Sequence, residues 1–372
     1  MGTGSNGSSV TEFTFFRGRV ALHAILKALR IKRGDSVALQ AFTCVAVPEA
    51  ILAAGARPLF IDVTAGGFTM DPSDLERKLT PQTRAIVVQH TFGIPGALIE
   101  IADIANRNGI PLVEDCCHSY LSSVNGRQVG SLGAASFYSF EWGKPLVAGM
   151  GGSAVTSDAG LRERLRSQHD TLQDPPLARN LRIELEYLGY RVMFRPSLYW
   201  FARRLKGVLG SLGVVESSYN GRYGEGASSD FLFRMAPSSR RRLMHAVGKI
   251  ERLADHSDWI THQYRERIRS PYVSHPVSEL GSKVVFGRYP LTSPHKKTIM
   301  RLASRAIVEV AGWYSSPVHP LSQAEWGVIG YADGCCLNAE QRAAQILTLP
   351  THIKVTQRDI DRTVDFFNSL QL

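Results

Sequence analysis

The stretch at residues 114–152 reads EDCCHSYLSSVNGRQVGSLGAASFYSFEWGKPLVAGMGG, and its first residues indicate the fold. An apolar run at residues 110–113 precedes it, and Glu114 and Asp115 follow that run directly. A short apolar run of this kind is typical of a buried strand. Carboxylates at the carboxyl end of such a strand lie where open α/β sheets bind ligands. We therefore expect Glu114 and Asp115 at the edge of a buried sheet, beside a functional site.

On both sides of this stretch, short apolar runs alternate with helical patterns. Further strands are expected at residues 37–41, 58–63, 85–89, 134–138 and 153–157. Helices are expected at residues 22–29, at 98–105, from Pro48 to residue 54, after the N-cap Asp71 and after the N-cap Asp158. This alternation predicts an α/β fold, with a mostly parallel sheet between helices on both faces.

The chain is long enough for two domains, because it has 372 residues of which 44% are apolar. We expect a disordered N-terminus at residues 1–12 and a large domain at 13–245, with a divergent insertion at about 168–230. A small C-terminal α+β domain is expected at residues 246–372. Its expected elements are a long helical stretch at 237–267 that leads into it, strands at 284–290 and 345–349, and helices at 296–308 and after Thr356.

Composition excludes several classes of protein. No apolar run reaches the length of a membrane span, and the polar N-terminus lacks the apolar segment of a signal peptide. Four of the five cysteines form vicinal pairs without ligand spacing, and the histidines are scattered. We therefore expect a cytoplasmic protein with reduced thiols and no metal. The net charge of +10 favours an anionic partner, although no nucleic-acid-binding module is visible.

Four side chains of the opening stretch fit the needs of pyridoxal phosphate. This cofactor requires a lysine for a Schiff base, an acid beside its ring nitrogen and donors for its phosphate. Lys144 is expected to hold the cofactor and then to act as general acid and base. Asp115 is the expected acid, His118 is expected over the ring face, and Ser139 is an expected phosphate donor. Taken singly, each is more often a structural residue, but their order and spacing favour the cofactor.

Four sequence blocks in this order resemble the DegT/DnrJ/StrS family of sugar aminotransferases, which are fold-type I enzymes that use pyridoxal phosphate. They are EDCCH at residues 114–118, NGRQVGSLG at 125–133, YSFEWGK at 138–144 and GMGG at 149–152. The resemblance covers the chain from about residue 17 to residue 365, apart from the insertion. It implies a fold-type I architecture with a large and a small domain.

The resemblance also extends the candidate site. Gly18 and Arg19 would hold the cofactor phosphate at a helix start, where backbone N–H groups are open to an anion. An ordinary helix start is the alternative for this pair. Cys44 stands where the family usually has an aromatic residue that stacks on the cofactor ring. Leu232 stands where the family has an asparagine that reaches the phosphate of the partner subunit; Arg234 or an arginine at residues 240–242 is a candidate substitute.

The function that the resemblance implies is amino transfer by a homodimer with its site at the subunit interface. Glutamate would supply the amino group, and a keto group on a nucleotide-linked sugar would receive it, in cell-surface polysaccharide or secondary-metabolite biosynthesis. A sugar dehydratase is one alternative, but such members carry a histidine in place of Lys144. A non-catalytic regulator that binds pyridoxal phosphate is another, because Cys44 and Leu232 depart from the family pattern.

The insertion contains a segment of unusual composition. Residues 190–206 mix aromatic side chains with five positive charges. Peripheral contact with a membrane surface is one interpretation, and cover for a partner subunit or for the mouth of the site is another. A partly buried helical insertion is the interpretation favoured at this stage. Residues 217–229 are rich in glycine and serine, which predicts a mobile loop.

Overall fold

The computed structural model describes residues 13–211, 229–277 and 281–372. The disorder expected for residues 1–12, and nearly all of the loop expected at residues 217–229, lie outside the described residues. Among the described residues, no helix combines the length and the apolar character needed to cross a bilayer.

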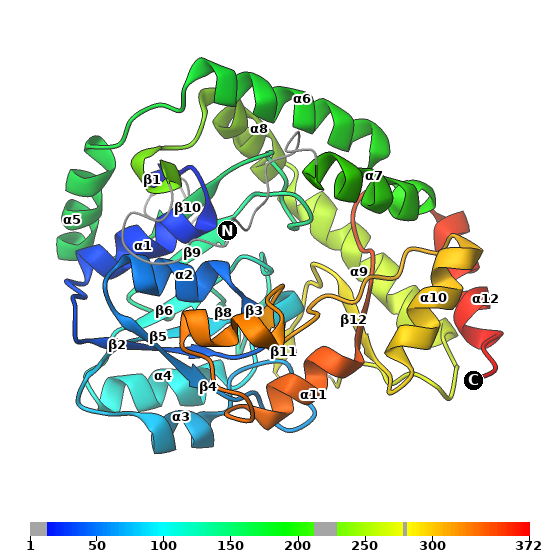
Figure 1. The fold of residues 1–372 in the computed structure, drawn as a ribbon, viewed down its shortest axis with the longest axis horizontal. Helices are drawn as coiled ribbons and strands as arrows, with labels where there is room; N and C mark the ends of the chain where they lie inside the picture. The colour runs from blue at the N-terminus through cyan, green and yellow to red at the C-terminus, as the bar shows by residue number, and fades with distance from the viewer. Residues whose placement is uncertain (1–12, 212–228, 278–280) are drawn as a thin grey trace.

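A seven-stranded sheet forms the centre of the molecule, in the order β1-β10-β9-β6-β5-β2-β4 (Figure 1). The strands from β4 to β9 pair in parallel, whereas β10 and β1 complete one edge in antiparallel pairing. This arrangement confirms the predicted α/β fold with a mostly parallel sheet. The strands are β1 (Phe13–Phe15), β2 (Ser36–Gln40), β4 (Arg57–Ile61), β5 (Thr83–Gln89), β6 (Leu112–Asp115), β9 (Ala135–Ser139) and β10 (Gly152–Val155).

Helices cover both faces of this sheet because successive side chains of a strand point to opposite faces. In β2, Val37 and Leu39 belong to the apolar cluster that includes α1, α2 and α5, whereas Ala38 belongs to the cluster that includes α3 and α4. Figure 1 shows the two helical layers on either side of the strands. The helices are α1 (Gly18–Ala28), α2 (Ala46–Ala53), α3 (Pro72–Lys78), α4 (Leu98–Arg107) and α5 (Ala159–Asp170).

Two helices of the large domain begin at the predicted N-cap residues. The Asp71 carboxylate accepts from the Ser73 N–H at the start of α3, and the Asp158 carboxylate accepts from the Leu161 N–H at the start of α5. The expected start of a helix at Pro48 is wrong, because α2 already begins at Ala46. Proline is tolerated there because the first turn of a helix does not use its N–H groups.

Four helices form an outer layer over the sheet and lead to the C-terminal part. They are α6 (Leu177–Met193), α7 (Tyr199–Ser211), α8 (Pro237–Val247) and α9 (Ile250–Arg267), with 3₁₀ turns at η2 (Pro196–Leu198) and η3 (Ser229–Leu232). α6 and α7 lie at the outer edge of the molecule, on the side away from α3 and α4 (Figure 1). The helical stretch predicted at 237–267 is present, but it is interrupted after Val247 and so forms two helices.

The C-terminal part contains a two-stranded antiparallel sheet with helices around it. Its elements are β12 (Tyr289–Thr292), β14 (Ile346–Leu349), α10 (Lys296–Ala306) and α12 (Gln357–Asn368). The strand expected at 284–290 is wrong in position, because it begins only at Tyr289. The predicted helix after Thr356 is confirmed as α12, and it begins with a capping box in which Thr356 and Asp359 exchange hydrogen bonds. The boundary between domains near residue 245 stays a prediction.

Shorter elements complete the fold. They are β3 (Thr43–Cys44), β7 (Ser123–Val124), β8 (Arg127–Gln128), β11 (Ser282–Lys283), β13 (Val318–His319), α11 (Leu337–Gln345), and the 3₁₀ turns η1 (Thr91–Gly93) and η4 (Gln323–Ile329). β13 pairs in parallel with β3, with His319 opposite Cys44. The C-terminal part therefore returns to the large sheet beside the residues that follow β2.

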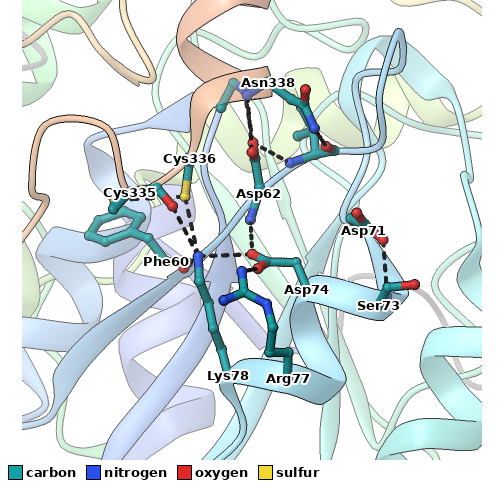
Figure 2. A network of polar contacts seen from close by, with 12 residues as sticks. Phe60, Asp62, Asp71, Ser73, Asp74, Arg77, Lys78, Cys335, Cys336 and Asn338 are labelled. Atoms are coloured by element: carbon teal, nitrogen blue, oxygen red, sulfur yellow. Dashed lines mark hydrogen bonds and ion pairs between the residues drawn. The ribbon is translucent and has the colours of Figure 1, made fainter.

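A polar network holds α11 against the large sheet (Figure 2). The N-cap residue of α11, Cys336, makes no side-chain cap, and Asp62 from the end of β4 takes its place. The Asp62 carboxylate accepts from the Asn338 N–H at 3.0 Å and from the Ala339 N–H at 2.9 Å. Beside it, the Lys78 amine bonds the Cys335 carbonyl at 3.1 Å. These contacts fix the C-terminal segment relative to the strands that carry the candidate site.

Candidate active site

One cavity is lined by all seven residues that the sequence singled out for the site. They are Gly18, Arg19, Cys44, Asp115, His118, Ser139 and Lys144. The cavity lies at the carboxyl ends of parallel strands, because Gln89, Asp115 and Ser139, which also line it, are the last residues of β5, β6 and β9. This is the edge at which open α/β sheets bind ligands. The structure thus brings the candidate residues together, while their chemical roles stay predictions.

Asp115 presents a buried carboxylate to the cavity from the end of β6. Burial raises the pKa of this carboxyl, although the Cys117 N–H, which donates to Oδ1 at 2.9 Å, and the nearby Lys144 amine act in the opposite direction. A buried carboxylate of this kind is stabilised by a cationic hydrogen-bond donor. Asp115 therefore suits a protonated heteroaromatic nitrogen.

Glu114, its neighbour, faces away from the cavity and has a structural role. Its carboxylate accepts from the N–H groups of Gly130, Leu132 and Gly133 at 2.6, 2.7 and 2.8 Å, and His90 Nε2 lies 3.0 Å away. Within the described residues, His90, Glu114 and Cys116 have ligand atoms close enough for a metal ion. Both oxygens of Glu114 are already engaged by backbone N–H groups, so this cluster holds the loop after β8 in place.

The start of α1 meets the end of β9 at very close range. A Cβ on Gly18 would lie 2.9 Å from the Cβ of Ser139, so no larger residue fits at this position without a shift. Gly18 is the first residue of α1, and no acidic residue occupies the first turn of that helix. The N–H groups of the helix start and the Ser139 hydroxyl therefore form the anion-binding arrangement that is typical of phosphate sites.

Two buried arginines beside the helix start have carboxylate partners. The Arg19 guanidinium donates to Glu49, and burial raises the pKa of the Glu49 carboxyl. Arg17, the N-cap residue of α1, contacts Glu141 at 2.8 Å and Asp230 at 2.6 Å. Arg19 thus brings a positive charge to the wall of the cavity, but Glu49 balances much of it. Arg17 ties the helix start to the loop that contains Lys144.

His118 lies among aromatic rings rather than facing water. Its ring stacks on Phe92 at 6.0 Å and on Tyr314 at 5.9 Å, and the Trp313 ring lies 5.0 Å away at a tilt. The Phe92 N–H points to Nδ1 at 3.5 Å. Burial lowers the pKa of His118 well below its ordinary value, and the Lys144 charge acts in the same direction. The imidazole is therefore neutral at physiological pH and is suited to stacking rather than to donating a proton.

Lys144 lies in the loop between β9 and β10, where glycines allow close packing. Its amine lies 5.4 Å from the centre of the Trp313 ring, over the ring face. Gly149 adopts a positive φ of 100°, and a Cβ on Gly152 would lie 2.4 Å from the Arg17 backbone. The motif at residues 149–152 therefore forms a turn that brings the lysine loop against α1, and it leads into β10 rather than into a helix.

Sequence reasoning missed most of the remaining wall of the cavity. Trp313 and Tyr314 reach it from the C-terminal part, and Gln89, Glu141 and Trp142 come from the large sheet and the lysine loop. Trp142 lies close to Lys144 inside the YSFEWGK block, so the sequence could have identified it as a residue that lines the cavity. Trp313 and Tyr314 follow α10 without a periodic pattern, and only the fold brings them to the cavity.

The two departures from the family pattern lie in different places. Cys44 lines the cavity, whereas Leu232 is 59% exposed and does not line it. The candidate substitutes for the family asparagine also lie elsewhere. Arg234 pairs with Asp174 at 2.7 Å, and Arg242 pairs with Glu184 at 2.7 Å.

Comparisons with known proteins agree with this geometry. Residues 13–195 match the model of the DegT/DnrJ/EryC1/StrS aminotransferase family. The UDP-N-acetyl-3-dehydro-alpha-D-glucosamine 3-aminotransferase of Acidithiobacillus ferrooxidans is 36% identical over 220 residues, which are 55% of this chain and 60% of that protein. The pleiotropic regulatory protein of Geobacillus stearothermophilus is 27% identical over 334 residues, which are 90% of this chain and 77% of that protein. The chain thus spans less than two thirds of the first of these relatives.

Solved structures share the fold over almost the whole chain. DesV of S. venezuelae superposes with a TM-score of 0.73 at 22% identity, covering 96% of this chain and 83% of DesV. The sugar aminotransferase CalS13 of Micromonospora echinospora superposes with a TM-score of 0.72 at 20% identity, covering 96% of this chain and 86% of CalS13. At such identities the likeness concerns the fold. Together with the family model, these similarities show that the chain belongs to the DegT/DnrJ/EryC1/StrS aminotransferase family and has the fold of sugar aminotransferases.

Proposed function

We propose that the protein is a pyridoxal-phosphate-dependent aminotransferase that moves an amino group from glutamate to a keto group of a nucleotide-linked sugar. The pathway would be the biosynthesis of a cell-surface polysaccharide or a secondary metabolite. The observation that carries this proposal is the convergence of Asp115, Ser139 and Lys144 on one cavity at the strand ends. Membership of the family supports the class of reaction.

The residues present fit pyridoxal phosphate. The start of α1 and the Ser139 hydroxyl would bind the phosphate, and a positively charged ring nitrogen would stabilise the ionised form of the buried Asp115 carboxyl. Lys144 supplies the amine that the cofactor needs for attachment. When bound, the cofactor supplies the electron sink that makes the amino-bearing carbon of a substrate acidic.

The chain's own residues would then orient the reactants and move protons. Once displaced from the cofactor, the Lys144 amine would take a proton from that carbon and return it to another position. The neutral His118 ring would hold the cofactor plane. Trp313 and Tyr314 would exclude water from one side, which strengthens the electrostatic interactions of Asp115 and Lys144.

Relatives support a sugar or cyclitol as the amino acceptor. One is named as a UDP-sugar 3-aminotransferase, and another is the GDP-perosamine synthase of Escherichia coli O157:H7, 37% identical over 151 residues. A third, from Streptomyces griseus, is named an L-glutamine:scyllo-inosose aminotransferase, 38% identical over 152 residues. The net charge of +10 suits an anionic nucleotide sugar better than an uncharged inosose.

Covalent attachment is the first test. The protein should bind pyridoxal phosphate with visible absorbance, and borohydride reduction followed by peptide mapping should place the label on Lys144. Lys144→Ala should abolish the label, and Lys249→Ala, at an exposed lysine outside the cavity, should keep it. A label on another lysine in the wild-type protein would contradict the assignment.

The half-reaction with an amino donor distinguishes an aminotransferase from a non-catalytic regulator. The long match to a pleiotropic regulatory protein makes a non-catalytic role the second candidate. If the protein is an enzyme, glutamate should convert the visible absorbance band to a near-ultraviolet one in the stoichiometry of the bound cofactor. Glutamine should be run in parallel, because one relative is named for it. No spectral change with either donor would favour the regulator.

We also propose that the protein acts as a homodimer with its site at the subunit interface. The support is the family pattern, in which the position of Leu232 belongs to the partner's site, together with the exposure of Leu232 in one chain. Sedimentation equilibrium should give twice the chain mass at micromolar concentration. A monomeric protein with full transaminase activity would contradict this part of the proposal.

A further inference from the structure

The exposed face of α6 is apolar, in contrast to most surface helices. Leu181, Leu185, Leu188 and Val192 follow one another at spacings of one helical turn and are 56%, 69%, 57% and 65% exposed. Ile183 is the one fully buried residue of this helix. A surface helix normally turns such an apolar stripe towards the core. α6 therefore presents to the outside the face that other helices bury.

Four of the five charged side chains of α6, all except Arg191, form ion pairs instead. Glu184 pairs with Arg242 of α8 at 2.7 Å, and Arg182 pairs with Glu186 at 3.2 Å along the helix. Arg179 pairs with the buried Asp230 of η3. These contacts fix the orientation of α6 about its own axis, so the ordered structure holds the apolar stripe on the outside.

α7 adds aromatic and basic side chains to the same outer layer. Phe201 and Val208 are 61% and 57% exposed. The partly exposed Glu184 carboxylate is paired with Arg242. Among the described residues between Leu177 and Leu205, the exposed charged residues are Arg191, Arg195, Arg203 and Arg204, which are all basic. We call the exposed residues of α6 and α7, together with these arginines, the α6–α7 face.

We propose that the α6–α7 face binds the surface of an anionic lipid membrane. The leucines, Val192 and Phe201 would enter the boundary between headgroups and acyl chains, and the arginines would contact lipid phosphates. Apolar side chains flanked only by positive charge fit such a surface. The same face of a second copy fits less well, since it carries the same exposed arginines and its partly exposed Glu184 is already paired with Arg242. The helices lie on the membrane in this arrangement and do not cross it.

Vesicle flotation with the full-length protein tests the proposal. The wild-type protein should float with vesicles of phosphatidylcholine and phosphatidylglycerol at low salt. With vesicles of phosphatidylcholine alone it should remain in the bottom fraction. Added sodium chloride should release a large part of the bound protein, because salt screens the arginines. Leu181→Glu with Leu188→Glu should lower the floated fraction by about tenfold or more, since two inserted side chains become charged.

Matched variants separate the apolar and the basic contributions. Arg191→Gln with Arg204→Gln should weaken binding to anionic vesicles while the circular dichroism spectrum stays unchanged. Val328→Glu with Ile353→Glu, at exposed apolar positions of the C-terminal part (59% and 46% exposed), should bind as the wild type does. The proposal is overturned if the wild-type protein does not bind anionic vesicles, or if the variant Leu181→Glu with Leu188→Glu binds them as well as the wild type does. It is also overturned if that variant changes only the sedimentation mass, which would assign the face to a second copy.

Discussion

At the scale of single residues, two neighbouring carboxylates have opposite roles. Glu114 and Asp115 end the same strand, and the alternation of side chains along a strand sends them to opposite faces. Asp115 lines the cavity, whereas Glu114 accepts three backbone N–H groups from one loop. The sequence predicted the position of the pair but not this division, because the loop that binds Glu114 becomes its neighbour only in the folded chain.

Asp115→Asn tests the role of the buried charge. The change keeps the shape of the side chain but removes the negative charge that would face the ring nitrogen of the cofactor. The half-reaction with glutamate should slow by about 10² to 10³-fold, as expected when one preorganised electrostatic partner is lost. Stopped-flow absorbance measures this rate, with cofactor occupancy determined separately. A rate close to that of the wild type would remove Asp115 from the proposed site.

Gly18→Ala tests the close approach of α1 and β9. The added Cβ would lie 2.9 Å from the Ser139 Cβ, so either the helix start or the strand end must move. We expect a loss of about 1–3 kcal/mol in the free energy of unfolding and weaker binding of pyridoxal phosphate. Urea denaturation and cofactor titration measure the two effects. Gly189→Ala, inside α6 with no atom near the new Cβ, is the control and should stabilise by about 0.5–1 kcal/mol.

At the scale of elements, regular patterns were predictable and irregular ones were not. Strands β2, β4, β5 and β9 lie close to their predicted positions, because each is an apolar run between turn residues. The strand expected at 284–290 begins only at Tyr289, although Val285 and Phe286 before it are buried in apolar clusters without being in a strand. Burial of an apolar run therefore does not by itself specify a strand.

The loop after β8 should make the protein sensitive to acid. Burial raises the pKa of the Glu114 carboxyl, but bonds from His90 and from the N–H groups of Gly130 and Gly133 outweigh it, and the pKa falls below the ordinary 4.5. A lowered pKa in the folded state means that Glu114 stabilises the fold above pH 4.5 and loses this effect as the pH falls through its folded-state value. Thermal unfolding measured between pH 7 and pH 3 should show this loss. Glu114→Gln should be less stable at pH 7, and its unfolding temperature should fall less steeply between pH 7 and pH 3 than that of the wild type. An equally steep fall would contradict the assignment of this acid sensitivity to Glu114.

At the scale of the whole molecule, the cavity depends on a C-terminal segment that the sequence did not connect to it. Trp313 and Tyr314 complete the wall, yet they lie far along the chain from Lys144 and carry no motif of their own. β13 and α11 anchor the segment after them to the large sheet, through β3 and through Asp62. The family sequence blocks predicted the cavity residues that come from the large sheet and the lysine loop. They did not predict Trp313 and Tyr314, because only folding brings these two residues to the cavity.

Asp62→Ala should loosen this segment and thereby change the site at a distance. Asp62 supplies the N-terminal cap that Cys336 does not provide, so its removal leaves the Asn338 and Ala339 N–H groups without that carboxylate. We expect a loss of about 1–2 kcal/mol in the free energy of unfolding, the usual effect of removing a cap. Because Trp313 directly precedes the anchored segment in the chain, the KM for the keto substrate should rise more than kcat falls.

Asp333→Ala is the matched control, because Asp333 is an exposed carboxylate close to α11 whose bond to Gln323 does not involve the large sheet. This variant should keep both the stability and the KM of the wild type. Limited proteolysis adds a direct readout: Asp62→Ala should be cut faster in the segment around α11, whereas the large sheet should stay resistant. If Asp62→Ala lowers the free energy of unfolding but leaves proteolysis around α11 and KM unchanged, the cap stabilises the fold without positioning the cavity wall. Trp313 and Tyr314 would then be held by their own contacts with His118 and Phe92.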